Sequence, residues 1–444
     1  MKIVIAGAGE VGTYLAKMLS NEDQDIIVCD TDERKLVNLE NYNLMTFNGS
    51  ATSFDALKNM SVPNADLFIA VTPYETCNVI ACAMAKELGA KRTVARIDNY
   101  EFMNTENQEF FKKQGIDYLI YPEHLAAQEI IIALNHTWVR NWYELYNGEL
   151  IVIGVKLRKN ALIVGKRLRE LSDISQFMHV SAIKRNRETI IPRGDDMIEE
   201  NDIAYIATTR EHLLKVTEIC GKKPVDVERI IIMGGGEIAV QLAMLVNDKY
   251  KIKIIESDLE RCHELSMLLP QCTIVNGSAS DSDVLEEEGV SDYNAFIALT
   301  SSSEANILSC LMAKELGVKK TIAEVENIQF IAEAESLNIG TIINKKLLAS
   351  SRIFQIMLDN DVSDSRSLAL ADAEVSELKV KEGAKVTKNE VKDLKIGSEM
   401  TIAGLVRDGK GLLVNGNTKI QPGDHVVVFC LNGAVHKVEK LFSR

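Results

Sequence analysis

Short apolar runs alternate with stretches of helical periodicity along residues 1–121. The runs are KIVIAG, DIIVCD, LMTF, DLFIAVT, RTVARI and DYLIYP. Between them, apolar residues recur every three or four positions, as over 11–20, from about 31, over 54–60 and over 76–88. Strands that are apolar on both faces and alternate with helices are typical of a parallel sheet covered by helices on both sides. The pattern predicts an α/β fold with a doubly wound parallel sheet.

The same pattern returns in the second half of the chain. NGSATSFDALKN at 48–59 matches NGSASDSDVLEE at 276–287, and ADLFIAVTPYETCNVIACAMAKELGAKRTVARIDN at 65–99 matches YNAFIALTSSSEANILSCLMAKELGVKKTIAEVEN at 293–327. Both pairs are offset by 228 residues, and Asn78 falls on Asn306 at the same offset. Solenoid repeats have periods of only about 20–50 residues. The chain is therefore predicted to be a tandem duplication of a whole domain.

A different pattern follows each predicted parallel sheet. Residues 144–224 hold the short strand-like runs LIVIGVKL, HVSAIKRN, IIPRGDD and DIAYIAT, and the chain ends on SELKVKEG, TIAGLVRDGKGLLVNGN and IQPGDHVVVFCL. Both halves end with a strand followed by a helix, in NDIAYIATTREHLLKV and GDHVVVFCLNGAVHKV. We therefore predict that a small α+β lobe follows each Rossmann-like lobe. The predicted segments are lobe 1–121, helix 122–141, small lobe 142–224, lobe 229–344, helix 345–360 and small lobe 366–444.

A glycine-rich turn follows the first strand of each half. The first, GAGEVG, has the spacing G-x-G-x-x-G, and the second, GGGEIA, has Ala239 in place of the third glycine. In such turns the first glycine permits the tight turn, the second lets a pyrophosphate approach the backbone, and the third lets helix and strand pack closely. The predicted cofactor contacts are Gly7, Ala8, Gly9, Glu10, Val11 and Gly12, and Gly234, Gly235, Gly236, Glu237 and Ile238.

An acidic residue ends the second strand of each half. Asp30 lies 18 residues after Gly12, and Glu256 lies 17 residues after Ala239. A carboxylate at this position accepts hydrogen bonds from ribose hydroxyls and repels a 2′-phosphate. The sequence therefore favours NAD(H) over NADP(H) at both sites. ATP, ADP and AMP present the same ribose hydroxyls and remain alternatives.

Further candidate residues follow the third, fourth and fifth strands, because ligands of such sheets bind beyond the carboxyl ends of the strands. They are Asn48, Gly49, Ser50, Thr72, Pro73, Arg96 and Asp98 in the first half, and Asn276, Gly277, Ser278, Thr300, Ser301, Glu324 and Glu326 in the second. Arg96 can pair with a phosphate, whereas Glu324, at the same position of the repeat, cannot. We therefore expect the two sites to differ in affinity.

A carboxylate also follows the second turn glycine in each half, as Glu10 and Glu237. One interpretation is a first-turn acid that complements the helix dipole. The other is an acid that a cation bridges to the ligand phosphates. The residues do not decide between the two.

Composition excludes several classes of protein. The 50 basic and 64 acidic residues give a net charge of −14, which argues against nucleic-acid binding because phosphate backbones require a basic surplus. The eight cysteines form no C-x-x-C pair, so we expect no metal site built on cysteines and a reducing compartment. The longest apolar runs, such as IIIAL and VVVFCL, are far shorter than the ~18–20 residues of a membrane helix, so we expect no direct membrane insertion.

The sequence offers no recognisable catalytic group. The seven histidines do not recur between the halves, and the motifs H-E-x-x-H, G-K-[ST] and G-x-S-x-G do not appear. A dehydrogenase needs a proton donor or acceptor that faces the nicotinamide. We therefore predict that the protein is not an enzyme and senses the nucleotide without transforming it. An NAD-dependent oxidoreductase is the alternative.

Five segments resemble the N-terminal lobe of the family of domains that regulate the conductance of potassium, the RCK domains. They are MKIVIAGAGEVGTYLAKMLS, DTDERKL, NGSA, AVTPYETCNVIACAMAKELGA and ARIDN. The small lobes resemble the C-terminal lobe of the same family. The resemblance implies a regulatory subunit that lies in the cytoplasm at the inner face of the cell membrane. It also implies a ring of several chains, such as a homotetramer, docked on an integral-membrane subunit that translocates potassium.

In this family, NAD(H) or adenine nucleotides such as ATP and ADP would bind the Rossmann-like lobes and gate the pore. The resemblance carries the NAD contacts onto Gly7–Val11, Asp30, Thr72–Pro73 and Arg96, and onto Gly234–Ile238, Glu256, Thr300–Ser301 and Glu324. A sensor of another cation system, such as an antiporter, is an alternative. The apolar faces of the helices at 122–141 and 345–358 are expected to pack either on neighbouring subunits or within the chain's own core.

Overall fold

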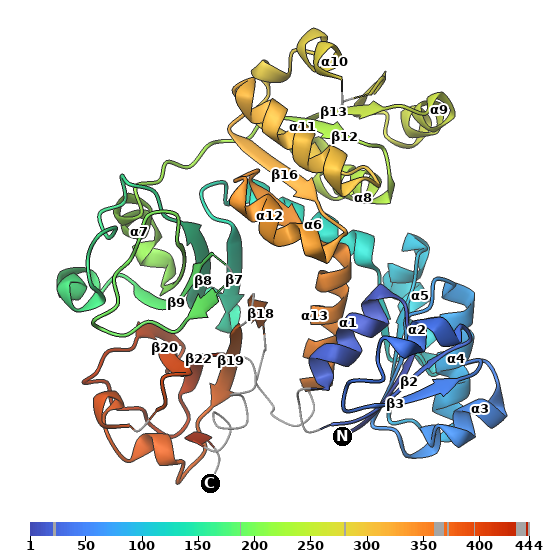
Figure 1. The fold of residues 1–444 in the computed structure, drawn as a ribbon, viewed down its shortest axis with the longest axis horizontal. Coiled ribbons are helices and arrows are strands. Elements are labelled where there is room, and N and C mark those ends of the chain that lie inside the picture. The colour runs from blue at the N-terminus through green and yellow to red at the C-terminus, as the bar shows by residue number, and fades with distance from the viewer. Residues whose placement is uncertain are drawn as a thin grey trace. The chain divides into compact units, whose positions relative to one another are not determined.

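The structure is a computed structural model, which describes residues 1–20, 24–186, 188–278, 281–358, 368–370, 373–394, 396–431 and 441–442 (Figure 1). It divides into two compact units, Met1–Gln128 with Asn344–Met357, and Glu129–Ile343 with Leu358–Arg444. The last two residues of the helix predicted at 345–360 lie outside the described residues. The predicted helix in the segment GDHVVVFCLNGAVHKV, which ends at residue 438, falls on residues 432–438, which lie outside them as well.

The first unit is built on a six-stranded sheet of order β3-β2-β1-β4-β5-β6 in which all neighbouring strands are parallel. Its elements are β1 (Lys2–Ala6), α1 (Glu10–Leu19), β2 (Asp25–Asp30), α2 (Glu33–Val37), β3 (Met45–Asn48), α3 (Phe54–Asn59), β4 (Leu67–Ala70), α4 (Glu75–Leu88), β5 (Arg92–Arg96), α5 (Thr105–Lys113) and β6 (Tyr118–Ile120). The strand order reverses between β1 and β4, and such a switch point is where these sheets bind ligands. The prediction of a doubly wound parallel sheet is confirmed.

The second unit contains a sheet with the same topology, of order β14-β13-β12-β15-β16-β17. Its elements are β12 (Arg229–Met233), α8 (Glu237–Val246), β13 (Lys251–Glu256), α9 (Leu259–Leu268), β14 (Thr273–Asn276), α10 (Ser282–Glu287), β15 (Ala295–Ala298), α11 (Ser303–Glu315), β16 (Lys320–Glu324), α12 (Ile331–Ser336) and β17 (Thr341–Ile343). Strands β4 and β15 are buried along their whole length, which explains why they are continuously apolar rather than alternating.

Two antiparallel sheets complete the second unit, of orders β10-β9-β11-β8-β7 and β18-β19-β22-β20-β21. Their elements are β7 (Asn141–Leu145), β8 (Leu150–Lys156), β9 (His179–Arg185), β10 (Glu188–Ile190), β11 (Ile203–Thr208), α7 (Leu213–Ile219), β18 (Leu368–Leu370), β19 (Ala373–Lys379), β20 (Met400–Arg407), β21 (Lys410–Leu413) and β22 (His425–Leu431). The two sheets share one apolar core, which includes Val152, Tyr205 and Phe429. The predicted small lobes are therefore present, and they pack on each other.

Two details of these lobes differ from the sequence prediction. Strand β7 was not predicted, because its sequence NWYEL has little apolar alternation and its pairing with β8 supplies the order. The run IIPRGDD contributes only Ile190 to a strand, since the Pro-Arg-Gly-Asp-Asp segment after it forms turns.

The two connecting helices are α6 (Pro122–Asn135) and α13 (Lys345–Leu358). Helix α6 ends before residue 141, the end of the predicted range, because Asn141 already belongs to β7. Helix α13 follows β17 in the chain but belongs to the first unit, where it packs with the first Rossmann-like lobe (Figure 1). The apolar face of α13 is buried within the chain, with Ile353 fully inaccessible. Of the two packing alternatives for α13, the structure shows the intrachain one.

The second half of α6 belongs to the unit that contains the second Rossmann-like lobe. At its end, the side-chain oxygen of Asn135 accepts hydrogen bonds from Lys249 Nζ at 2.7 Å and from the Tyr250 hydroxyl at 3.1 Å. Helix α13, which follows the sheet of the second lobe in the chain, thus packs in the first unit. The end of α6, which follows the sheet of the first lobe, contacts the second lobe. Among the described residues, no helix is long and apolar enough to cross a membrane.

Candidate nucleotide-binding sites

The three glycines of the first turn are required for different reasons. Gly7 has a φ of +110°, and a Cβ there would lie 3.0 Å from the Val71 carbonyl. A Cβ at Gly12 would lie 1.9 Å from the carbonyl oxygen of Gly7, so the helix can approach the strand only without a side chain. A Cβ at Gly9 would meet nothing within 4 Å. Open space therefore lies beside the second glycine, where a pyrophosphate is expected.

Asp30 connects the end of β2 to the first turn. Its Oδ2 accepts a hydrogen bond from the backbone N–H of Ala8 at 2.8 Å, and its Oδ1 accepts one from the backbone N–H of Asp32 at 2.9 Å. Lys35 Nζ lies 3.7 Å from Oδ2. Each carboxylate oxygen keeps a second lone pair, which suits it to accept from ribose hydroxyls. Val11, the remaining predicted contact of this turn, is buried in α1.

The second site repeats this arrangement around Glu256. Its Oε2 accepts from the backbone N–H of Gly235 at 2.7 Å, and its Oε1 accepts from the Asp258 N–H at 2.8 Å and the Ser257 hydroxyl at 3.2 Å. Partial burial acts to raise the pKa of Glu256, but the backbone donors of Asp258 and Gly235 outweigh it and lower the pKa overall. The carboxylate is therefore ionised at neutral pH.

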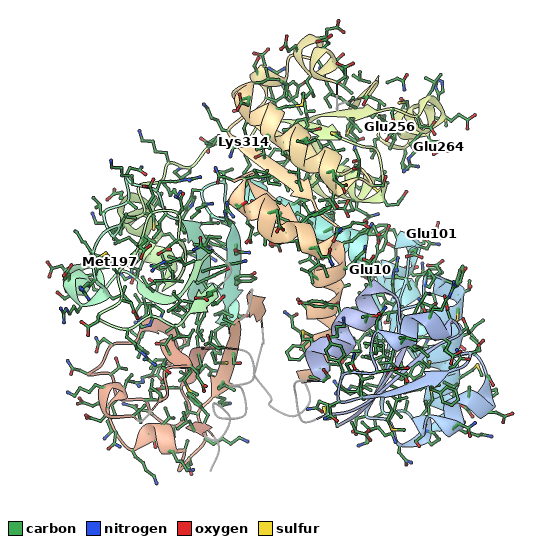
Figure 2. All side chains as sticks on the ribbon, in the orientation of Figure 1. Glu10, Glu101, Met197, Glu256, Glu264 and Lys314 are labelled. Carbon is green, nitrogen blue, oxygen red and sulfur yellow. The ribbon has the colours of Figure 1, made fainter. Side chains whose placement is uncertain are left out.

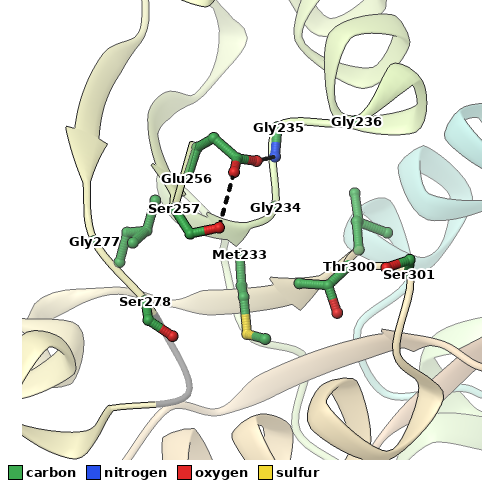
Figure 3. A pocket seen from close by; sticks show the side chains of 12 residues that line it. Met233, Gly234, Gly235, Gly236, Glu256, Ser257, Gly277, Ser278, Thr300 and Ser301 are labelled. Atoms are coloured by element: carbon green, nitrogen blue, oxygen red, sulfur yellow. Dashed lines mark hydrogen bonds between the residues drawn. The ribbon is translucent and has the colours of Figure 1, made fainter. Parts of the chain in front are cut away.

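A cavity of about 270 Å³ opens beside this carboxylate (Figure 3). Glu256 and Ser257 lie on one side of it and Thr300 and Ser301 lie on the other. Its lining residues are Met233, Gly234, Gly235, Gly236, Ile255, Glu256, Ser257, Gly277, Ser278, Leu299, Thr300 and Ser301. The structure thus brings residues from the ends of β12, β13, β14 and β15 together. Glu237, Ile238 and Glu324 lie outside this lining.

The residues after the third strand join neighbouring strand ends. The Asn48 amide donates to the carbonyl oxygens of Asp30 at 3.4 Å and Thr31 at 3.3 Å. Asn276 donates to the corresponding carbonyls of Glu256 and Ser257, both at 3.1 Å. Ser50, also predicted, is half-buried, and its hydroxyl lies 3.0 Å from that of Thr52. Pro73, which follows the fourth strand, is exposed.

A buried asparagine fixes the mouth of each site, a role that was not predicted from the sequence. Asn78 accepts from the Thr72 N–H at 2.9 Å and the Thr72 hydroxyl at 2.7 Å, and it donates to the carbonyls of Thr72 at 3.0 Å and Arg96 at 2.9 Å. Asn306 makes the same four bonds to Thr300 and Glu324, at 3.0, 2.7, 2.8 and 2.9 Å. A polar residue that recurs at the repeat offset on an otherwise apolar helix face was the available signal.

The residues after the fifth strand differ between the sites. Arg96 donates from Nη2 to Asp98 Oδ1 at 3.0 Å, and its Nε is buried without a hydrogen-bond partner among the described residues. The backbone N–H of Asp98 donates to Glu75 Oε2 at 2.9 Å. Glu324 is only 4% exposed. The backbone N–H of Glu326 donates to the Ser303 hydroxyl at 3.0 Å.

Both acids at the helix starts are paired with a cation of the protein. Glu10, labelled in Figure 2, begins α1, and its carboxylate contacts the amine of Lys346 on α13. Glu237 accepts from Arg261 Nη2 at 2.9 Å, and Arg261 Nε donates to the Gly235 carbonyl at 2.9 Å. Across the described part of the chain, no group of three or more His, Cys, Asp or Glu residues is placed to hold a metal ion.

Known proteins are similar to this chain along its whole length. The model of the TrkA-N domain matches residues 3–122 and 230–345, and that of the TrkA-C domain matches residues 152–221 and 375–443. The Trk system potassium uptake protein TrkA of Halomonas elongata is 30% identical over 453 residues, covering 100% of this chain and 99% of its own. That of Haemophilus influenzae is 31% identical over 455 residues, with the same coverage.

The fold is also similar to that of solved structures. The crystal structure of the GsuK RCK domain has a TM-score of 0.60 and 14% identity, covering 99% of this chain and 94% of the other. The structure of the GsuK channel bound to NAD has a TM-score of 0.60 and 14% identity, covering 99% of this chain and 78% of the other. With both domain models matched twice, and with relatives aligned from end to end, the chain belongs to the TrkA family of Trk system potassium uptake proteins.

Proposed function

We propose that this protein is a regulatory subunit that binds NAD(H) or an adenine nucleotide in its Rossmann-like lobes and gates a potassium-translocating membrane subunit. The observation that carries the proposal is the pair of matched contacts between an acid and a glycine turn. Asp30 accepts from Ala8 at 2.8 Å, and Glu256 accepts from Gly235 at 2.7 Å. The GsuK channel, which has a similar fold, has been solved with NAD and with ADP.

In this proposal the ribose hydroxyls bind the acid at the end of the second strand. The pyrophosphate lies beside Gly9 or Gly236, where a Cβ would meet nothing within 4 Å and where α1 or α8 begins. The first N–H groups of a helix have no partner within the helix and attract an anion. Thr72 with Pro73, and Thr300 with Ser301, border the ligand from the fourth strand. The segments of the chain are proposed to act as lobes with the boundaries predicted from the sequence.

The nucleotide is proposed to act as a signal and not as a reactant. Among the described residues that line the second cavity, Glu256 is the single ionisable side chain, and it is already bonded to the turn. Hydride transfer needs a partner group that can give or take a proton. Gating needs only a ligand with different affinities for two conformations. We propose that a homotetrameric ring at the cytoplasmic face of the membrane supplies those two conformations.

The binding half of the proposal is tested by calorimetric titration of NADH, NAD, ADP and ATP into the unaltered chain and into Asp30→Ala, Glu256→Ala and the double variant. Loss of a charge-assisted hydrogen bond is worth about 1.5–3 kcal/mol, so each single variant should bind about 10- to 100-fold more weakly at its own site. Asp32→Ala is the matched control, because that carboxylate caps α2 and pairs with Arg34. Unchanged affinity in the double variant would contradict the proposal.

The gating half is tested by potassium flux into proteoliposomes that contain the Trk membrane subunit. Flux should respond to nucleotide with the unaltered chain and lose that response with the double variant. The nucleotide should be recovered unchanged from the reaction. A flux response that survives in the double variant would place the gating signal elsewhere.

A further inference from the structure

Lys346 belongs to the second half of the sequence, yet its amine lies at the glycine-rich turn of the first half, on the carboxylate of Glu10. We propose that Lys346 is a phosphate-binding residue of the first nucleotide site. When a diphosphate or triphosphate binds, the ammonium group of Lys346 pairs with the phosphates in place of Glu10. This inference rests on the proposed nucleotide binding and names the residue that recognises the phosphates.

Helix α13 is anchored to the first lobe near both of its ends. Near its C-terminus, Arg92 at the start of β5 donates to the carbonyl oxygens of Ile356 and Met357, the latter at 3.2 Å. At its first residue, Lys345 Nζ lies 3.4 Å from Glu123 Oε1. These contacts do not involve the glycine-rich turn. They therefore hold Lys346 beside the turn whether or not a ligand is present.

The charges at the turn favour an exchange of partners. The Lys346 side chain is 19% exposed and that of Glu10 is 67% exposed, so the carboxylate can rotate into water while the ammonium stays in place. Gly9, the N-cap of α1, makes no side-chain cap, and the N-terminal N–H groups of α1 attract an anion. A phosphate with more than one negative charge binds this combination more strongly than a single carboxylate does.

The second site is neutralised in another way. Helix α6 follows the sixth strand of the first lobe, as α13 follows the sixth strand of the second lobe. The second residue of α13 is Lys346, whereas the second residue of α6 is Glu123, a carboxylate. Glu237 is paired instead with Arg261 of its own lobe, which also donates to Gly235. The first site is therefore the one in which the acid of the turn is paired with a cation from the other half of the chain. Since one residue, Asn344, joins β17 to α13, the phosphate would bind a segment directly connected to the second lobe.

The test is calorimetric titration of ADP and of adenosine into the full chain carrying Glu256→Ala. This substitution weakens binding at the second site, so the measured affinity is that of the first site. Lys346→Met should weaken ADP binding about 10-fold, the equivalent of about 1.4 kcal/mol, and leave adenosine binding unchanged. Lys346→Arg should keep most of the ADP affinity. Glu10→Gln should raise ADP affinity about 3-fold or more, because it removes the competing carboxylate.

The matched control is Arg352→Met, which removes an exposed cation of the same helix that donates to Gln355 Oε1 at 3.2 Å and should change neither affinity. Equal ADP affinity in Lys346→Met and in its parent would overturn the proposal. So would an equal loss of adenosine binding, which would indicate a merely structural role. If Asp30→Ala lowers ADP affinity and Lys346→Met does not, only this inference fails. If no nucleotide binds the unaltered chain, the proposed function fails as well.

Discussion

The two Rossmann-like lobes have the same skeleton and different charges around their sites. Both have the strand order of a doubly wound sheet, and both fix the site mouth with one buried asparagine that makes four hydrogen bonds. The first lobe has Arg96 where the second has Glu324, and Glu10 is paired by a lysine from the other half. Glu237 is paired by Arg261 of its own lobe.

The difference shows which positions the duplicated lobes hold fixed. Replacing Asn78 or Asn306 would leave several buried backbone groups unsatisfied, and each such group costs about 1–3 kcal/mol. A partly exposed acid such as Glu10 or Glu237 can change partner at little cost, because exposed ion pairs contribute only about 0–1 kcal/mol. The two halves can therefore differ in their ligand contacts while they keep one fold.

The largest expected effect tests what the lobes share. Asn78→Ala and Asn306→Ala should each lower the free energy of local opening by about 3 kcal/mol, because four hydrogen bonds are lost inside the protein. Hydrogen exchange of the amides in β4 and β5, and in β15 and β16, measures this. Asn38→Ala, at an exposed position, is the control. If only one of the two substitutions lowered the free energy of local opening this much, the asparagine would not stabilise both lobes in the same way.

The next effect distinguishes the lobes by pH. Burial lowers the pKa of Lys320 to about 7, well below that of a lysine in the unfolded chain. Between pH 7 and about 10 the unfolded state binds more protons, so the second lobe gains stability as pH rises. Below pH 7 both states are protonated and the cost of burying the charge is fully present. Denaturant unfolding should therefore show a gain of about 2 kcal/mol from pH 7 to pH 9 that Lys320→Met abolishes.

The control for this measurement is in the first lobe. Arg92 occupies the position that corresponds to Lys320, and an arginine side chain does not lose its proton in this range. Arg92→Met should therefore leave the pH dependence of stability as it is. If Arg92→Met abolishes the gain of stability with pH as Lys320→Met does, then deprotonation of Lys320 is not the source of that gain.

The smallest effect concerns the third position of the turn, which is Gly12 in one lobe and Ala239 in the other. Gly12→Ala should cost about 1.5 kcal/mol net, because the strain of a Cβ that would meet the carbonyl oxygen of Gly7 at 1.9 Å exceeds the gain of about 1 kcal/mol in helix propensity. Ala239→Gly should cost about 1 kcal/mol from helix propensity alone. Hydrogen exchange in α1 and α8 compares them. A neutral Gly12→Ala would show that the first turn tolerates a methyl group as the second does.

Local and repeated patterns were sufficient to predict much of the fold. Continuous apolar runs predicted the buried parallel strands, and the repeat offset predicted a second copy of the sheet. The contacts of Asp30 with Ala8 and of Glu256 with Gly235 place the two acids beside the two turns, as the spacing of the motif indicates. Strand β7 was missed, because only its partner β8 orders a sequence with little alternation.

The sequence by itself determined the duplicated α/β architecture and the positions of the glycines and acids, because these depend on side-chain period and on backbone conformations near in the chain. Only the tertiary structure decided that α13 packs on the first lobe and that Lys346 contacts Glu10. The sequence separation of these residues exceeds three hundred, so no local pattern encodes their meeting. The packing of the apolar core determines which helix covers which sheet. Because α13 packs on the first lobe, Lys346 lies at the glycine-rich turn of that lobe.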